Sequence, residues 1–314
     1  MFWLLIGNGI LLCSAQTADP VLYFSDITSG PKLGNSDASS GRVAGLDGAI
    51  VTIWGVNLGA SRGDSKVVCN GADAASYYYW GDATAPSNMH AYHKMQMISF
   101  QVSHLARDGA GEISVTVNGR QSNSLSYTIR SGNICFVKTR GDDNSGNGSW
   151  TQPWKSIAKA VATIAAGDIA YIGDGVDATM ETDFSAAINL GSSGTADNPK
   201  ALVVYPGATS RVGNPDLERA FHIWNLEVGG YSEHWVLSKF TITTIDDNTG
   251  LLRIQRWFTA AQAGCPSGAG TCFVTPVTAL ANGSYRWWIQ TWNDSGYGPW
   301  SDAMSFTIAL SGQK

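Results

Sequence analysis

The sequence has few charged residues and no run of basic ones. Asp, Glu, Lys and Arg make up 14% of its 314 residues, against about 25% in an average soluble domain. The formal net charge of -5 gives no electrostatic basis for binding a nucleic-acid backbone. Disorder is also excluded, because disordered chains combine high charge with low hydrophobicity, whereas 44% of these residues are hydrophobic.

Long apolar runs are lacking as well. No stretch beyond the N-terminus approaches the ~18 apolar residues that a membrane span needs, so we expect no transmembrane span. The N-terminus reads MFWLLIGNGILLCSAQTADP, a shorter apolar run that ends in small residues. This is typical of a secretory signal peptide, here over residues 1–16, although the usual initial Lys or Arg is missing. We expect bacterial-type export to the medium or cell surface; a buried strand or short anchor is the alternative.

Cysteine is scarce, with five in the chain. Cys265 and Cys272 bracket the loop Cys-Pro-Ser-Gly-Ala-Gly-Thr-Cys, and an exported protein meets an oxidising compartment, so we predict a disulfide between them. A zinc site is disfavoured there, because the spacing is not Cys-x-x-Cys and no His is near. Cys69 and Cys135 either pair with each other or remain buried thiols.

Glycine (36) and tryptophan (12) are abundant, which suits a mostly β protein with tight turns. Residues 20–130 alternate short apolar runs with turn residues, and no long helical pattern interrupts them. Several short strands with regular turn signals predict an immunoglobulin-like β-sandwich. The expected strands are 21–24, 49–55, 66–69, 97–102, 112–117 and 125–129.

A glycine-rich turn makes this stretch similar to a known family. Gly55, Asn57, Leu58 and Gly59 follow a strand as Gly-x-Asn-Leu-Gly, and Asn118-Gly119 closes a later one. Glycine permits backbone angles that other residues resist, and Asn can bond within its own turn. With this pattern, residues 20–130 resemble an IPT/TIG domain. The insertion over 74–94 departs from it.

The character of the chain changes at Ile134. An apolar strand leads into an Asp/Gly-rich loop, followed by Trp150-Thr-Gln-Pro-Trp154. A helix is expected next, with Thr151 or Gln152 as its cap and Pro153 in its first turn. Its apolar stripe at i, i+3, i+4 and i+7 would be buried, and Gly167 would end the helix. The stripe consists of Ile157, Ala160, Val161 and Ile164.

This order of strand, loop, capping helix and strand resembles the N-terminal cap of right-handed parallel β-helix proteins, the pectate-lyase-like family. The strands at 201–205, 221–224 and 234–242 are nearly continuous apolar runs, as expected of strands buried on both faces. We predict a truncated parallel β-helix over 134–250. It has room for about three or four coils, near the minimum for a stable stack.

The last part of the chain, 251–310, resembles the C-terminal half of a fibronectin type III domain. The similarity rests on Tyr285-Arg-Trp-Trp-Ile-Gln-Thr-Trp-Asn293 and on Gly296-Tyr-Gly-Pro-Trp-Ser301. The first strands of such a domain are shortened or missing. The chain is therefore expected to hold a partial fibronectin-like β module after the β-helix.

Two sets of polar residues are candidates for chemistry. Asp142, Asp143 and Asp174 belong to an acidic cluster that could supply the oxygen ligands of calcium, the possible cofactor; ordinary turns are the alternative. His234 and Lys239 are the catalytic candidates in a late cluster worth testing, which also holds His222, Asp246 and Asp247. The family resemblance places catalytic groups on coils further along, so no catalytic residue is carried over. We do not expect an active lyase.

Aromatic residues give the clearest indication of a ligand, because sugars pack their apolar C–H faces on rings, and Trp and Tyr add a polar tip. Neighbouring residues of an extended run face opposite ways, so part of the run 77–80 and of the run 287–292 should be exposed. The candidate binding residues are Tyr78, Trp80, Trp288 and Trp292; core packing is the alternative at each.

Three functions remain open from the sequence. The leading one is a secreted or cell-surface modular protein that binds a polysaccharide or a cell-surface glycan. A polysaccharide lyase or glycosidase relative is the second, and a structural, adhesin-like spacer is the third. A basic strip beside an acidic metal cluster would favour the enzyme, whereas an aromatic surface without one would favour binding.

Overall fold

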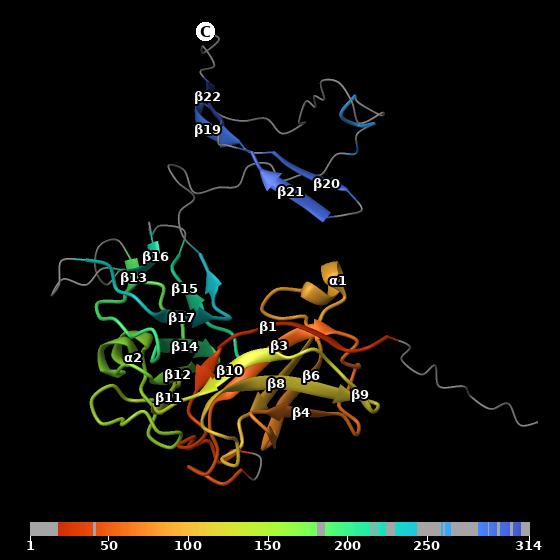
Figure 1. Cartoon of the computed structure of the whole chain (residues 1–314). Coiled ribbons are helices and arrows are strands. Elements are labelled where there is room, and N and C mark those ends of the chain that lie inside the picture. Colours follow the sequence, from red (N-terminus) through yellow and green to blue (C-terminus); the bar gives the residue numbers. More distant parts are fainter. Residues whose placement is uncertain are drawn as a thin grey trace, which may run out of the picture. The chain divides into compact units, whose positions relative to one another are not determined.

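The structure is a computed structural model, and its first part carries most of the described residues (Figure 1). The chain divides into two compact units, Met1–Asn248 and Thr249–Lys314. The structure describes residues 18–39, 42–180, 186–214, 217, 219–223, 230–243, 259, 261–264, 282–287, 289–293, 296–301 and 304–308. The mostly β fold class is confirmed.

Two sheets form the first half of the larger unit, and their strands pair antiparallel except for β2, which is parallel to β10. The first has the order β1-β3-β7-β6 and consists of Val21–Ser25, Ile50–Val56, Gln96–Gln101 and Ser76–Asp82. The second has the order β2-β10-β8-β4-β5, with β9 paired to β8. Its strands are Ser29–Gly30, Leu125–Ile129, Gly109–Val117, Lys66–Cys69, Ala72–Asp73 and, for β9, Arg120–Gln121. The short helix α1, Met89–His93, lies in the insertion between β6 and β7.

Parallel strands form the second half. The sheet β11-β12-β14-β17 runs through Ile134–Val137, Ile169–Ile172, Lys200–Val204 and Trp235–Ser238, every pair parallel. Two further parallel pairs join β13 (Ala186–Asn189) to β16 (Arg219–His222), and β15 (Arg211–Val212) to β18 (Thr241–Ile242). Each winding of the chain thus adds strands beside those of the previous winding. This parallel pairing is what coils require; membership of the β-helix family stays a prediction.

Helix α2, Ile157–Thr163, packs its buried face against the interior side chains of this parallel stack. It ends earlier than predicted, at Thr163 instead of at Gly167, because Ile164 already has an extended backbone. Its apolar stripe is buried as expected, with Ile157 only 1% and Ile164 only 3% exposed. The cap differs from the prediction: Ser156 accepts a hydrogen bond from the backbone N–H of Lys159, and the helix begins after it. The residues before Ser156 do not join the helix, because Trp154 forms a parallel β-bridge with Val137.

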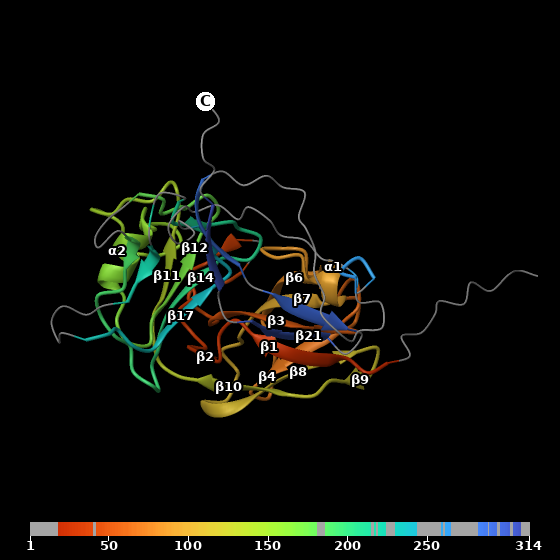
Figure 2. The ribbon, with the colours of Figure 1, turned by 90° about the horizontal axis from the view of Figure 1, so that it is seen from above.

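The two halves of the larger unit lie side by side (Figure 2) and share a core. Side chains alternate between the two faces of the parallel strands, and this alternation explains how the halves share a core. Phe136 and Tyr171 are paired across neighbouring strands and pack with the antiparallel sheets, whereas Val137 and Ile172 face the interior of the stack with α2. Both faces of these strands are therefore buried, which accounts for their continuous apolar sequence. The Tyr171 hydroxyl also bonds to the backbone of Ile50, accepting from its N–H (2.6 Å) and donating to its C=O (2.8 Å).

Among the described residues of the smaller unit, the strands form two antiparallel pairs. Strand β19 (Gly283–Trp287) pairs with β22 (Met304–Ile308), and β20 (Gln290–Asn293) pairs with β21 (Gly296–Trp300). The fibronectin-like assignment of this unit stays a prediction. Cys265 and Cys272, and with them the expected disulfide, lie outside the described residues.

Candidate functional site

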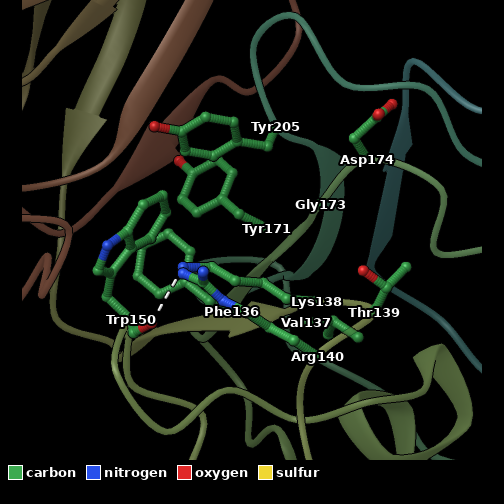
Figure 3. A pocket seen from close by; sticks show the side chains of 10 residues that line it. All are labelled: Phe136, Val137, Lys138, Thr139, Arg140, Trp150, Tyr171, Gly173, Asp174 and Tyr205. Carbon is green, nitrogen blue, oxygen red and sulfur yellow. Dashed lines mark hydrogen bonds between the residues drawn. The ribbon is translucent and has the colours of Figure 1, made fainter. Parts of the chain in front are cut away.

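An open cleft of about 310 Å³ lies in the larger unit at the end of the first parallel strands (Figure 3). Residues after β11, β12 and β14 come together there, because parallel strands bring their carboxyl ends to one edge. Trp150 joins them from the Asp/Gly-rich loop. The cleft is lined by Phe136, Val137, Lys138, Thr139, Arg140, Trp150, Tyr171, Gly173, Asp174 and Tyr205.

One wall of the cleft is aromatic. The Phe136 and Trp150 rings meet edge to face with centroids 5.0 Å apart, and Trp150 lies 5.6 Å from Tyr205. Phe136 and Tyr171 are register partners on β11 and β12, with centroids 5.9 Å apart. Such contacts add stability beyond burial. Phe136 and Tyr171 are each only 1% exposed, so Trp150 and Tyr205 supply the exposed part of the wall.

Backbone hydrogen bonds hold the loop that carries Trp150 in place. The N–H of Phe136 donates to the C=O of Gly148 (2.7 Å), and the N–H of Trp154 donates to the C=O of Phe136 (3.0 Å). The N–H of Trp150 donates to the Ser36 hydroxyl (2.9 Å), which belongs to the antiparallel half. The aromatic wall is therefore held from both halves of the unit.

Two cations lie at the aromatic wall. The Lys138 ammonium lies 2.9 Å from the centroid of the Trp150 ring and donates to the Trp150 carbonyl at 3.0 Å. Lys138 and Arg140 point toward the same place beside this ring (Figure 3). The pKa of Lys138 is lowered to about 8, mainly by burial and also by the charge of Arg140, while the charge of Asp37 opposes the change.

Asp37 supports the wall from behind. It is fully buried, and its carboxylate accepts hydrogen bonds from the hydroxyls of Tyr205 (2.7 Å) and Tyr78 (3.1 Å). Burial is the largest cause of the raised pKa of both tyrosines, and the Asp37 charge adds to it, so both stay protonated donors. The sequence places Asp37 in a Gly/Ser/Asp-rich loop and gives no signal for this contact, which spans 168 positions to Tyr205.

The predicted aromatic surface at Tyr78 and Trp80 is packed rather than open. Both rings are half-buried against the core. Arg42 covers Tyr78, with its guanidinium carbon 3.7 Å from the ring centroid, and the Trp80 indole N–H donates to the Leu58 carbonyl (2.9 Å). The structure thus favours core packing at these positions. Trp288 is outside the described residues; Trp292 lies on β20, but its side chain is not among them.

The three aspartates considered for calcium hold the backbone of turns. Asp142 accepts from the N–H groups of Asn144 and Ser145, Asp143 from those of Lys155 and Ser156, and Asp174 from that of Thr209. These bonds lower the pKa of Asp142 and of Asp174. Within the described part of the chain, no three His, Cys, Asp or Glu side chains are grouped to hold a metal.

The two catalytic candidates do not form one site. The Lys239 ammonium lies in the interior, 3.3 Å from the Asp26 carboxylate and 3.1 Å from the Thr52 hydroxyl. Burial lowers the pKa of Lys239 and raises that of Asp26, while their mutual attraction opposes both shifts. The His234 side chain is 41% exposed and lies 3.8 Å from Glu233. Lys239 is therefore a core residue and not a base that faces a substrate.

Cys69 and Cys135 are buried free thiols, which settles their pairing. Burial raises the pKa of each to about 12, so both are protonated at neutral pH and unreactive. No helix among the residues that the structure describes is long and apolar enough to span a membrane.

Comparison with known proteins gives limited similarity. No family description matches the chain, and no curated protein matches it. Among solved structures, the complex of XylC with xylose is 20% identical, with a TM-score of 0.22, over 25% of this chain and 11% of that one. A rhamnogalacturonan lyase is 19% identical, with a TM-score of 0.23, over 36% and 26%. The chain thus spans about a tenth and a quarter of these two proteins, and scores this low establish no shared fold.

Proposed function

We propose that the larger unit binds a saccharide in the cleft beside Trp150. The observation that carries this proposal is the juxtaposition of an aromatic wall with a few polar groups, Lys138, Arg140 and Asp174, in one concave site. A saccharide has both kinds of surface: its C–H faces pack on rings, and its hydroxyls bond to charged side chains. Because Lys138 covers the Trp150 ring, a sugar would contact the wall near Tyr205 while its hydroxyls meet the two cations.

The size of the cleft favours a short stretch of a glycan. Its volume of about 310 Å³ lies at the small end of ligand pockets, which range over about 300–1,000 Å³. The protein is therefore proposed to hold one part of a polysaccharide or surface glycan, with the rest of the glycan outside the cleft.

The test is binding by the purified full chain, first on a glycan array and then by calorimetry with the best ligand. Arg140→Ala should weaken binding about tenfold, roughly 1.4 kcal/mol, because an exposed charged donor to a sugar hydroxyl is lost. Arg62→Ala is a matched control, since Arg62 is also exposed and lies 5.0 Å from a ring centroid, that of Tyr77, outside the cleft. No glycan bound, or equal loss in both variants, would overturn the proposal.

Export is part of this proposal, because it would bring the cleft to extracellular glycans. It rests on the apolar N-terminal run that ends in Cys13-Ser14-Ala15. Expression of the full chain with a C-terminal tag, followed by fractionation and N-terminal sequencing, tests it. A mature protein starting near residue 17 outside the cytoplasm is expected.

A further inference from the structure

Lys138 is an amine held in place inside a concave site. It directly follows strand β11, and its backbone N–H donates to the Trp154 carbonyl at 2.8 Å. Its side chain is half-buried, and its nitrogen is fixed between the Trp150 ring and the Trp150 carbonyl. Lys138 also lines the cleft, so a small molecule bound there would lie beside its side chain.

Among the charged groups around Lys138, Arg140 favours the neutral amine, and Asp37 favours the ammonium. Arg140 converges on the same place with a like charge (Figure 3). Tyr171, Tyr205 and Asp174 also line the cleft. Asp37, the acid whose charge acts on Lys138, already accepts bonds from Tyr205 and Tyr78.

Desolvation and a neighbouring cation are the two conditions that activate a lysine as a nucleophile. With its pKa near 8, about a quarter of the Lys138 amine is neutral at pH 7.5, roughly two-hundredfold more than for an ordinary lysine. The Trp150 carbonyl can accept a bond from the neutral amine as well as from the ammonium, so loss of the proton does not release the side chain.

We propose that Lys138 is a carbonyl-reactive lysine that condenses with an aldehyde bound in the cleft. The nitrogen lone pair attacks the carbonyl carbon, a C–N bond forms, and the C=O π electrons move to oxygen. A proton passes from nitrogen to that oxygen, giving a carbinolamine, which loses water to give the imine. No oxidant or reductant is needed. Arg140 is positioned to donate to the oxygen that leaves.

The aldehyde can come from two sources, a free small aldehyde or the open-chain form of a sugar's reducing end. The step requires a carbonyl group alone and does not depend on the proposed saccharide binding. Glycolaldehyde represents the first source, glucose the second, and glucitol, which has no carbonyl, is the blank.

The purified full chain is incubated with each compound and cyanoborohydride at pH 7.5, and the labelled lysines are identified by peptide mapping. Glycolaldehyde should label Lys138 at least about tenfold faster than the exposed Lys155, given its larger neutral fraction. Labelling by glucose as well would assign the sugar source, and labelling by glycolaldehyde alone the small aldehyde. Labelling of Lys138 no faster than Lys155 would overturn the proposal.

A pH profile separates this role from simple accessibility. Arg140→Gln removes the like charge, so the midpoint of the Lys138 labelling rate should move to higher pH; Arg62→Gln, matched and outside the cleft, should not move it. An unmoved midpoint in the Arg140 variant would contradict the proposal. Lys138→Arg keeps the cation and removes the amine: it should abolish labelling at this position, and glycan binding by this variant reports on the proposed function separately.

Discussion

At the scale of single residues, the ion pair of Asp26 and Lys239 lies in the interior of the larger unit. The Asp26 side chain is fully buried, and Lys239 reaches it from the turn between β17 and β18. The second Asp26 oxygen accepts from the N–H groups of Ile27 and Thr52. A buried pair of this kind adds little stability over an apolar replacement, but removing one partner leaves an uncompensated charge.

Lys239→Met should therefore destabilise the larger unit by about 3–5 kcal/mol. The double variant Asp26→Asn with Lys239→Met should recover much of that loss, because no charge remains buried. Urea unfolding followed by circular dichroism measures both. If the single and double variants unfold at the same urea concentration, the buried-charge explanation is wrong.

Asp143 gives a prediction for pH. Burial raises its pKa, but bonds from the Ser156 hydroxyl and from the N–H groups of Lys155 and Ser156 lower it below the ordinary value overall. A carboxyl with a depressed folded-state pKa contributes stability above its unfolded pKa, about 4, and loses it as the pH falls through the folded pKa. Asp143→Ala should cost about 1 kcal/mol at pH 7 and little at pH 2.5.

Thermal unfolding of the wild-type protein and the Asp143 variant at the two pH values checks this. Asp64→Ala serves as the control, because Asp64 is exposed. A difference from wild type that persists unchanged at pH 2.5 would show that the Asp143 effect is not one of charge.

At the scale of elements, the sequence predicts local structure better than the site. The stripe from Ile157 to Ile164 was enough to predict a helix and its buried face, since periodicity is local. The cap was predicted too early, because strand-like pairing of Trp154 with Val137 is a contact that no local pattern reports. Tyr78 and Trp80 show the same limit: alternation indicates that neighbouring side chains point apart, but not what covers each face.

The cleft itself could not be predicted. Its aromatic wall depends on the register that pairs Phe136 with Tyr171 and on a loop held by Ser36 and Asp37. Neither the register nor these long-range contacts leaves a pattern in one sequence. Lys138 directly follows β11, and only the fold places it against Trp150.

The buried stripe of α2 leads to a prediction for this element. Ile164→Asp would place an unpaired carboxylate where the side chain is 3% exposed, so we expect a loss of several kcal/mol. Ala158→Asp is the control, because Ala158 is on the same helix but exposed and near its start, where a negative charge is favourable. Equal urea midpoints for the Ile164 and Ala158 variants would contradict the assignment of Ile164 to the buried face of the helix.

At the scale of the whole chain, the two compact units of the structure do not coincide with the modules that the sequence motifs suggest. The sequence suggests separate modules over 20–130 and 134–250, yet residues up to Asn248 form one compact unit with a shared core. If Gly30 carried a Cβ atom, that atom would lie only 3.1 Å from Cδ1 of Ile169 on β12. The two halves therefore approach each other closely at this point. Large shared apolar surfaces make two such halves unfold together.

The contact between Tyr171 and Ile50 tests this cooperativity directly. Tyr171→Phe removes the hydroxyl that bonds to both the N–H and the C=O of Ile50, leaving buried backbone groups without a partner, at a cost of about 1–3 kcal/mol. Because the halves share a core, this loss should lower the opening free energy of β3 and β12 by the same amount, although only β12 carries the substitution.

Hydrogen exchange in mild urea, resolved by peptide, measures the two strands separately. Tyr79→Phe removes a hydroxyl bonded only to the nearby Asp82 carbonyl and should leave β12 unchanged relative to β3. Exchange of β12 at lower urea than β3 in the Tyr171 variant would show that the two halves unfold as separate domains.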